Sequence, residues 1–171
     1  MTFDAAELLI RTVEPADAAG VVAVFNPIIE AGCYTSFDTP FTVEAEQAFI
    51  EGMKERDIFQ VAVRQHDGRI VGFQSMAPVP SFSQAFAHVG VLGTFVDLAC
   101  RRQGIGRQLF AATLPLARQK GYKKIFTYVR ADNSGGLAAY LAQGFRIVGT
   151  AQQHIKIGER YIDEIVIEKL L

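Results

Sequence analysis

Hydrophobic residues recur along the chain with two distinct periods, and each period predicts one kind of element. Short apolar or alternating runs predict strands, at residues 8–13, 59–65, 69–79, 87–98, 123–129, 145–157 and 161–171. Longer stretches with apolar residues three and four positions apart predict helices, at residues 15–31, 43–53, 105–120 and 133–143. The sequence His66-Asp67-Gly68 between the second and third strands is typical of a hairpin turn.

The helical stretches also carry signals for their ends and faces. Thr42 is suited to cap the second helix, and Pro27 is expected to bend or divide the first. On the second helix we expect a buried face made of Ala45, Ala48, Phe49, Gly52 and Met53. On the third helix the expected buried face consists of Ile105, Leu109, Ala112 and Leu116.

The order of the elements, β-α-α-β-β-β-α-β-α-β-β, combines hairpins with strand–helix–strand units. Such a combination predicts an α/β (α+β) fold with a mixed sheet rather than a wholly parallel one. With 171 residues and neither repeats nor linker-like segments, the chain is expected to form one domain, residues 1–171.

Composition narrows the cellular setting. The net charge is -1, with 50% hydrophobic and 20% charged residues, so no global positive field favours nucleic acid or an anionic membrane. The N-terminus lacks the basic region of a signal peptide, and no apolar stretch approaches the ~18 residues of a membrane helix. Cys33 and Cys100 lack metal-ligand or redox spacing and are expected to be reduced thiols. These features predict a cytoplasmic protein.

The stretch VDLACRRQGIGRQLF, residues 96–110, contains two glycines and three arginines at the point where a strand passes into a helix. A helix start offers unpaired N–H groups and the positive end of the helix dipole, and glycines let a phosphate approach them. The stretch therefore suggests a pyrophosphate site; the alternative is a flexible turn with a solvated basic face. It lacks the P-loop sequence, and Leu109 occupies the third glycine position of a dinucleotide-binding motif.

A second stretch, VRADNSGGLAAYLAQGFRIVG, places an asparagine at a helix cap and a tyrosine seven residues later. Together the two stretches resemble the GCN5-related N-acetyltransferase (GNAT) superfamily. Its cofactor motif, [RQ]-x-x-G-x-[GA], is met by Arg101, Gly104 and Gly106. Its later signature, N-x-x-A-x-x-L-Y-x-x-x-G-F, is met by Asn133, Tyr140, Gly144 and Phe145, with departures at Gly136 and Ala139. The resemblance covers essentially the whole chain.

This resemblance implies a GNAT fold: a mixed, mostly antiparallel sheet of six to seven strands, splayed between the fourth and fifth, with about four flanking helices. It implies acetyl-CoA as donor, and cofactor contacts from Thr94, Phe95, Val96, Arg101, Arg102, Gln103, Gly104, Ile105, Gly106, Arg107, Asn133 and Tyr140. A backbone N–H of Phe95 or Val96 would stabilise the oxyanion formed when an amine attacks the thioester. Tyr140 would protonate the departing thiolate, whose conjugate thiol has a pKa near ~8.5.

The group that removes the proton from the amine is left open by the sequence. The phosphinothricin-acetyltransferase branch has a glutamate where this chain has Val91, so the base is His88, Glu164, or Asp163 through water, or no single residue. No metal is expected, because the histidines are scattered along the chain.

The acceptor is expected to be the primary amine of a small amino-acid-like molecule. Residues 24–50 resemble the first helix, loop and second helix of the phosphinothricin branch, which makes Tyr34, Phe37 and Phe41 candidate specificity residues; the alternative is that they are core anchors. That branch also implies a homodimer. Two other functions stay open: an acetyltransferase acting on peptide or ribosomal-protein N-termini, and a non-catalytic acyl-CoA sensor.

Overall fold

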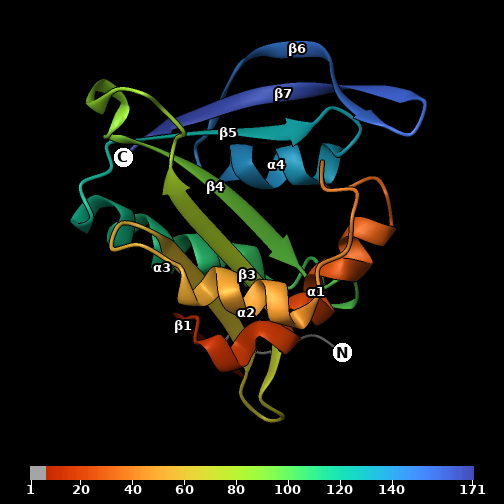
Figure 1. Cartoon of the computed structure of the whole chain (residues 1–171), viewed down its shortest axis with the longest axis vertical. Coiled ribbons are helices and arrows are strands. Elements are labelled where there is room, and N and C mark those ends of the chain that lie inside the picture. The colour runs from red at the N-terminus through yellow and green to blue at the C-terminus, as the bar shows by residue number, and fades with distance from the viewer. Residues whose placement is uncertain (1–6) are drawn as a thin grey trace.

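In the computed structural model, which describes residues 7–171, one seven-stranded sheet runs through the whole molecule (Figure 1). Its strands are β1 (Leu8–Thr12), β2 (Ile58–Arg64), β3 (Arg69–Pro78), β4 (Val89–Val96), β5 (Lys124–Arg130), β6 (Arg146–Ile157) and β7 (Arg160–Leu170). The helices are α1 (Ala18–Glu30), α2 (Val43–Glu51), α3 (Ile105–Gln119) and α4 (Ser134–Ala142). Short 3-10 turns lie at η2 (Pro15–Asp17), η3 (Gln84–Phe86) and η4 (Leu98–Cys100).

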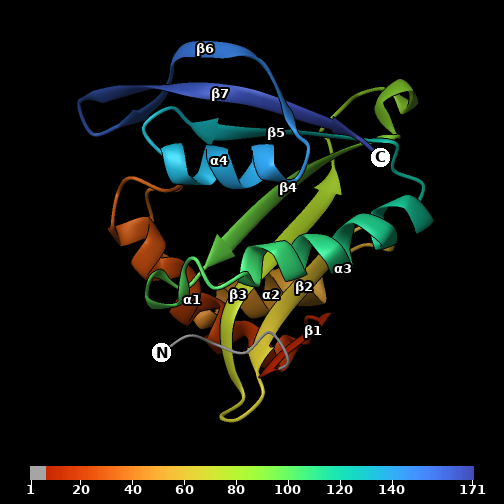
Figure 2. The same ribbon diagram turned by 180° about the vertical axis from the view of Figure 1, so that it is seen from behind.

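The strands lie in the order β1-β2-β3-β4-β5-β7-β6. All neighbouring strands are antiparallel except β4 and β5, so the expected mixed, mostly antiparallel sheet is confirmed. The parallel pair is joined only at its beginning, where Val89 pairs with Lys124 and Gly90 with Ile125. Beyond that point β4 and β5 diverge, and the predicted splay between the fourth and fifth strands is confirmed (Figures 1 and 2).

Helices cover both faces of the sheet. A first core cluster joins α1 and α2 to β2 and β3, with the rings of Phe25, Phe59 and Phe73 in contact. On the opposite face (Figure 2), α3 packs on β1 to β4, and its Phe110 meets Tyr140 of α4 edge to face in a cluster that also contains residues of β5 and β7. This second cluster contains Ile58 and Met76 from one half of the sheet and Ile125 and Ile167 from the other, so it joins the two halves on that face.

Two sequence expectations about buried faces need correction. The helix α1 is not divided at Pro27 and runs continuously from Ala18 to Glu30. The prediction for the buried face of α2 is wrong. Ala45, Ala48 and Phe49 are exposed, whereas Glu46 and Ile50 are buried. The reason is that α2 packs mainly against α1 and η2 instead of lying flat on the sheet.

The buried face of α3 is rotated from the expected one. Ile105 and Leu109 are buried as expected, but the stripe continues through Thr113 and Ala117, leaving Ala112 and Leu116 half-buried at its edge. A further difference is that β4 ends at Val96 rather than continuing to residue 98. Asp97 ends it because its carboxylate accepts a bond from the Ala99 amide (2.8 Å) and thereby caps η4.

Candidate active site

Two cavities meet where β4 and β5 separate. A cavity of about 550 Å³ opens on the side of α1, α2 and the loop between them, and is called the acceptor cavity below. A cavity of about 480 Å³, called the loop cavity, lies between α4 and the start of α3. The two share six lining residues: Tyr34, Thr94, Phe95, Asn133, Gly136 and Tyr140. A molecule bound in one cavity can therefore reach a molecule bound in the other beside Thr94 and Tyr140.

The loop cavity is built to hold an anion at the start of α3. Gly104 caps the helix with φ +81°, and Arg102 before it also has a positive φ, 61°. A Cβ added to Gly104 or Gly106 would meet nothing within 4 Å, so the space beside these two residues at the helix start is open. Its charged lining residues are Arg101, Arg102 and Arg107, without a carboxylate among the described residues. This cradle fits a pyrophosphate.

The predicted cofactor residues gather here with one exception. Gln103 does not line the loop cavity, and its Oε1 is buried without a hydrogen-bond partner among the described residues. The members of the set that line the cavity are Thr94, Phe95, Val96, Arg101, Arg102, Gly104, Ile105, Gly106, Arg107, Asn133 and Tyr140. The sequence motifs therefore identified most of the residues that line the loop cavity on the side of α3.

The register of β4 decides which of its backbone groups face the splay. The Val79 amide donates to Val89 and the Asp97 amide to Val71, both across the β3–β4 ladder at 3.0 Å. Between these bonds the pairing is uninterrupted, so every second residue, Phe95 included, points its amide towards β3. The amides of Thr94 and Val96 point towards the splay instead. Of the two candidate oxyanion donors from the sequence, the Phe95 amide is therefore excluded and the Val96 amide remains. The Thr94 amide is an additional candidate.

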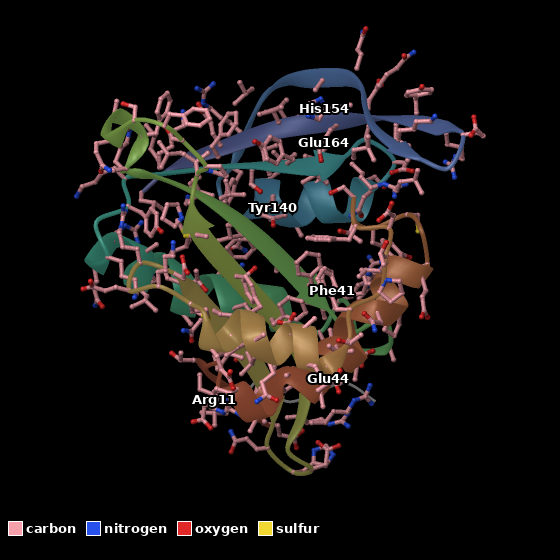
Figure 3. The ribbon with its side chains drawn as sticks, viewed as in Figure 1. Arg11, Phe41, Glu44, Tyr140, His154 and Glu164 are labelled. Atoms are coloured by element: carbon pink, nitrogen blue, oxygen red, sulfur yellow. The ribbon has the colours of Figure 1, made fainter. Side chains whose placement is uncertain are left out.

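Tyr140 lies at the junction of the two cavities (Figure 3). Its hydroxyl is 3.2 Å from Thr94 Oγ1 and 3.4 Å from the carbonyl oxygen of Leu92. Its ring packs edge to face on Phe110 and Phe145, which fixes its orientation. Burial raises the pKa of the phenol to about 12, so Tyr140 keeps its proton at neutral pH and can donate it.

Thr94 connects Tyr140 to a buried glutamine that the sequence did not single out. The Gln74 Nε2 atom donates to Thr94 Oγ1 at 2.7 Å. Because Thr94 Oγ1 receives this bond, its own hydroxyl proton is left for another acceptor, and the Tyr140 oxygen is within reach. Gln74 is fully buried and was found only through its register opposite Thr94.

The three candidate bases lie in different places. Glu164 is buried on β7 and lines the acceptor cavity, where burial raises the pKa of its carboxyl; His154, 3.8 Å away, lowers it by a smaller amount. Figure 3 shows Glu164 on the same side of the splay as Tyr140, with His154 beyond it on β6. Asp163 accepts a bond from the Gln153 amide and lines neither cavity. His88 is exposed just before β4 and also lines neither cavity.

The loop between α1 and α2 is tied to the C-terminal half by three contacts. Asn133 Nδ2 donates to the Tyr34 carbonyl (3.0 Å), while its Oδ1 caps α4 by accepting from Gly136. Arg130, a buried residue not anticipated from the sequence, donates to the Thr35 carbonyl (2.9 Å). The Arg101 guanidinium stacks on the Tyr34 ring at 3.8 Å. These contacts hold Tyr34 between the two cavities.

The aromatic residues of this loop divide into two roles. Tyr34 and Phe37 line the acceptor cavity, which supports their assignment as specificity residues. Phe41 does not line it: its ring stacks on Phe25 at 5.6 Å, and Asn26 makes two hydrogen bonds to its backbone. Phe41 is therefore a core anchor.

Three further properties bear on the sequence expectations. Both Cys33 and Cys100 are free thiols, as expected. Within residues 7–171 no group of three or more His, Cys, Asp or Glu side chains could hold a metal ion. Over the same residues no helix is both long and apolar enough to cross a membrane.

Comparisons with known proteins agree with this geometry. YwnH of Bacillus subtilis, named as a candidate phosphinothricin acetyltransferase, is 25% identical over 141 residues, covering 81% of this chain and 83% of that one. The crystal structure of a ribosomal-protein-alanine N-acetyltransferase from Brucella melitensis superposes with a TM-score of 0.88 at 28% identity, covering 95% and 99% of the two chains.

A third match is another solved structure. The phosphinothricin acetyltransferase of Sinorhizobium meliloti, crystallised with acetyl-CoA, has the same fold, with a TM-score of 0.87 at 16% identity over 96% of this chain and 89% of that one. The sequence profile of the acetyltransferase (GNAT) family matches residues 29–145, which include Asn133, Tyr140 and the loop of residues 101–107, called the arginine–glycine loop below. The chain therefore belongs to the GNAT family of acetyltransferases.

Proposed function

We propose that the protein transfers the acetyl group of acetyl-CoA to the primary amine of a small amino-acid-like molecule, by direct attack on the thioester. The observation that carries this proposal is the meeting of two cavities at Thr94 and Tyr140. With the nucleotide end of the donor on the arginine–glycine loop, the thioester would come to this junction, and an amine in the acceptor cavity would approach it from the other side.

Glu164 is proposed as the base that accepts the proton of the amine. Among the described residues that line the acceptor cavity, the carboxylates are those of Asp57 and Glu164. Glu164 is buried, and its raised pKa brings it closer to the operating pH than an exposed glutamate. His88 is not proposed for this role, because it lies outside both cavities.

Tyr140 is proposed as the acid that protonates the departing sulfur. The amides of Thr94 and Val96 are proposed to donate hydrogen bonds to the thioester carbonyl oxygen or to the pantetheine arm. The raised pKa of Tyr140 means that its phenolate is costly to form. The Thr94 hydroxyl is positioned to donate a hydrogen bond to that phenolate, since its own oxygen is held by Gln74. This arrangement lowers the cost of the proton transfer.

The acceptor panel that tests this function also separates it from its alternatives. Release of coenzyme A thiol is measured with acetyl-CoA and, in turn, amino acids, simple amines and peptides with N-terminal alanine. We expect acetylation of small amines and only weak reaction with peptides, because the loop from residue 31 to 42 is pinned over the acceptor cavity. Preference for peptides would support a ribosomal-type activity. Tight binding of acetyl-CoA without transfer to any acceptor would support a sensor.

Glu164→Gln is expected to lower kcat at pH 7 by about ten- to a hundredfold; general bases contribute about 10²–10⁴-fold, and bulk water can replace part of this one. A base must be deprotonated, so in the natural protein kcat should fall as pH drops through the raised pKa of Glu164. This fall in kcat should be centred at a pH above the ordinary pKa range of a glutamate, and it should be absent in the variant. An unchanged pH profile of kcat in the variant would exclude Glu164 as the base.

We also propose that the protein is a homodimer located in the cytoplasm. The apolar residues Ile147 and Val148 on the edge strand β6, and Leu141 on α4, are 40–49% exposed outside both cavities, and such surfaces often serve as contacts between chains. The free thiols suit a reducing compartment. Sedimentation should give twice the mass of one chain, and Val148→Lys should shift it towards the single chain. A single-chain mass throughout the micromolar range would refute the dimer.

A further inference from the structure

Negatively charged side chains outnumber positively charged ones among the residues that line the acceptor cavity. Its charged lining residues are Asp57, Arg130 and Glu164. The one cation of this set is already engaged: Arg130 makes two hydrogen bonds to Asp132, at 2.9 and 2.7 Å, and a third to the Thr35 carbonyl. Its side chain is only 1% exposed. The cavity therefore offers two carboxylates and a neutralised arginine to whatever enters it.

This balance suits a protonated amine and opposes an additional anion. An ammonium group gains from the carboxylates, whereas an acidic group on the same molecule would lose water without meeting a free cation in the described lining. The contrast with the loop cavity is direct, because that cavity has three arginines and no carboxylate among its described lining residues. Each cavity thus has the charge opposite to that of its proposed occupant.

Most of the remaining wall of the acceptor cavity is apolar, and several of its residues are aromatic. Phe59 and Phe95 form part of its wall, and both belong to the aromatic cluster around Phe73. At its edge, the rings of Phe37 and Phe49 are 46% and 57% exposed. Apolar rings left open on a cavity wall are typical of sites that bury an apolar ligand.

Val91 belongs to the same apolar wall. It lies on β4 opposite Ala77, and both residues line the acceptor cavity. Val91 therefore presents an apolar side chain to a molecule in this cavity.

From the charge balance and the aromatic wall we infer that the acceptor carries its primary amine on an apolar body, aromatic or long aliphatic, without an acidic side chain. The inference rests on the proposed function and narrows it. It favours phenethylamine, which has no anionic group, and next phenylalanine and methionine, whose α-carboxylate is their only anionic group. It disfavours glutamate and phosphinothricin, whose second anionic group would have no positive partner.

The inference is tested by kcat/KM for these five acceptors, measured by thiol release with acetylated product confirmed by mass spectrometry. We expect the best apolar acceptor to exceed both acidic ones by at least about a hundredfold. If acidic acceptors are acetylated as well as the apolar ones or better, this inference is wrong while the proposed function stands. If acceptors of neither kind are acetylated and only peptides react, the proposed function itself fails, and the inference with it.

A charge placed in the cavity provides the matched variant. Val91→Arg adds a cation beside the acceptor, and Val91→Met adds similar bulk without charge. The measured quantity is the ratio of kcat/KM for glutamate to that for methionine, which does not depend on the fraction of folded protein. We expect Val91→Arg to raise this ratio at least about tenfold and Val91→Met to leave it within about twofold. An unchanged ratio in Val91→Arg would overturn the inference, because the charge of the cavity would then not select the acceptor.

Discussion

Tyr140→Phe is expected to lower the turnover number by about 10²–10⁴-fold, the range that general acid catalysis contributes. The substitution removes one oxygen, 3.2 Å from Thr94 Oγ1, and leaves the sulfur of the departing coenzyme without its proton donor. The loss should shrink with acyl donors whose thiols are more acidic, because a better leaving group needs less protonation. Turnover is to be measured at saturating acceptor, under conditions in which chemistry limits the rate.

The variant should fold normally, which makes its kinetic loss interpretable. The ring contacts with Phe110 and Phe145 need only the aromatic ring. Neither partner of the lost hydroxyl is orphaned: Leu92 still accepts from Thr127 Oγ1 at 2.7 Å, and Thr94 still accepts from Gln74. The melting temperature and the affinity for acetyl-CoA should therefore hardly change. A turnover number in this variant equal to that of the unsubstituted protein would show that Tyr140 is a packing residue.

Gly106→Asp is expected to weaken acetyl-CoA binding by about 10²–10⁴-fold. The new carboxylate would occupy the open space in front of the helix start, repel the pyrophosphate and compete for its N–H groups. Losing two charge-assisted hydrogen bonds at ~1.5–3 kcal/mol each costs ~3–6 kcal/mol, which corresponds to that range of Kd. Calorimetric titration with acetyl-CoA measures the change.

An aspartate in the first turn of a helix is favourable, so α3 should not be destabilised by this substitution. Gly106→Ala is the matched control, because its methyl group also enters open space but carries no charge. Binding should be nearly retained in Gly106→Ala and lost in Gly106→Asp. Equal affinities in the two variants would place the pyrophosphate elsewhere.

The parts of the site that could be predicted from the sequence are those built from neighbouring residues. The cradle at Gly104 and Gly106 and the cap at Asn133 are contiguous with the helices they begin, and a short motif contains all that is needed to form them. The order of strands and helices was predictable for the same reason, since each element carries its own hydrophobic period.

Residues brought together by the sheet were not predictable in the same way. Gln74 meets Thr94, and Arg130 lies opposite Glu164, because of strand registers that depend on the whole sheet. The choice between the Phe95 and Val96 amides depends on the same register, since a shift of one residue reverses the direction of every amide. The buried face of α2 was predicted incorrectly for a related reason. The helix packs against α1 and η2, and nothing within residues 43–51 identifies these two elements as its neighbours.

The most direct test of the account follows a labelled acetyl group from donor to product. The protein is mixed with acetyl-CoA labelled in the acetyl group and with an accepted amine, and the protein, the thiol and the amine are analysed by mass spectrometry within one turnover. Direct transfer across the junction at Thr94 and Tyr140 predicts label on the nitrogen of the acceptor, one thiol released for each acetylated amine, and no label on the protein at any time. Label on the protein before the acceptor is acetylated, for example on Cys33 or Cys100, would contradict it.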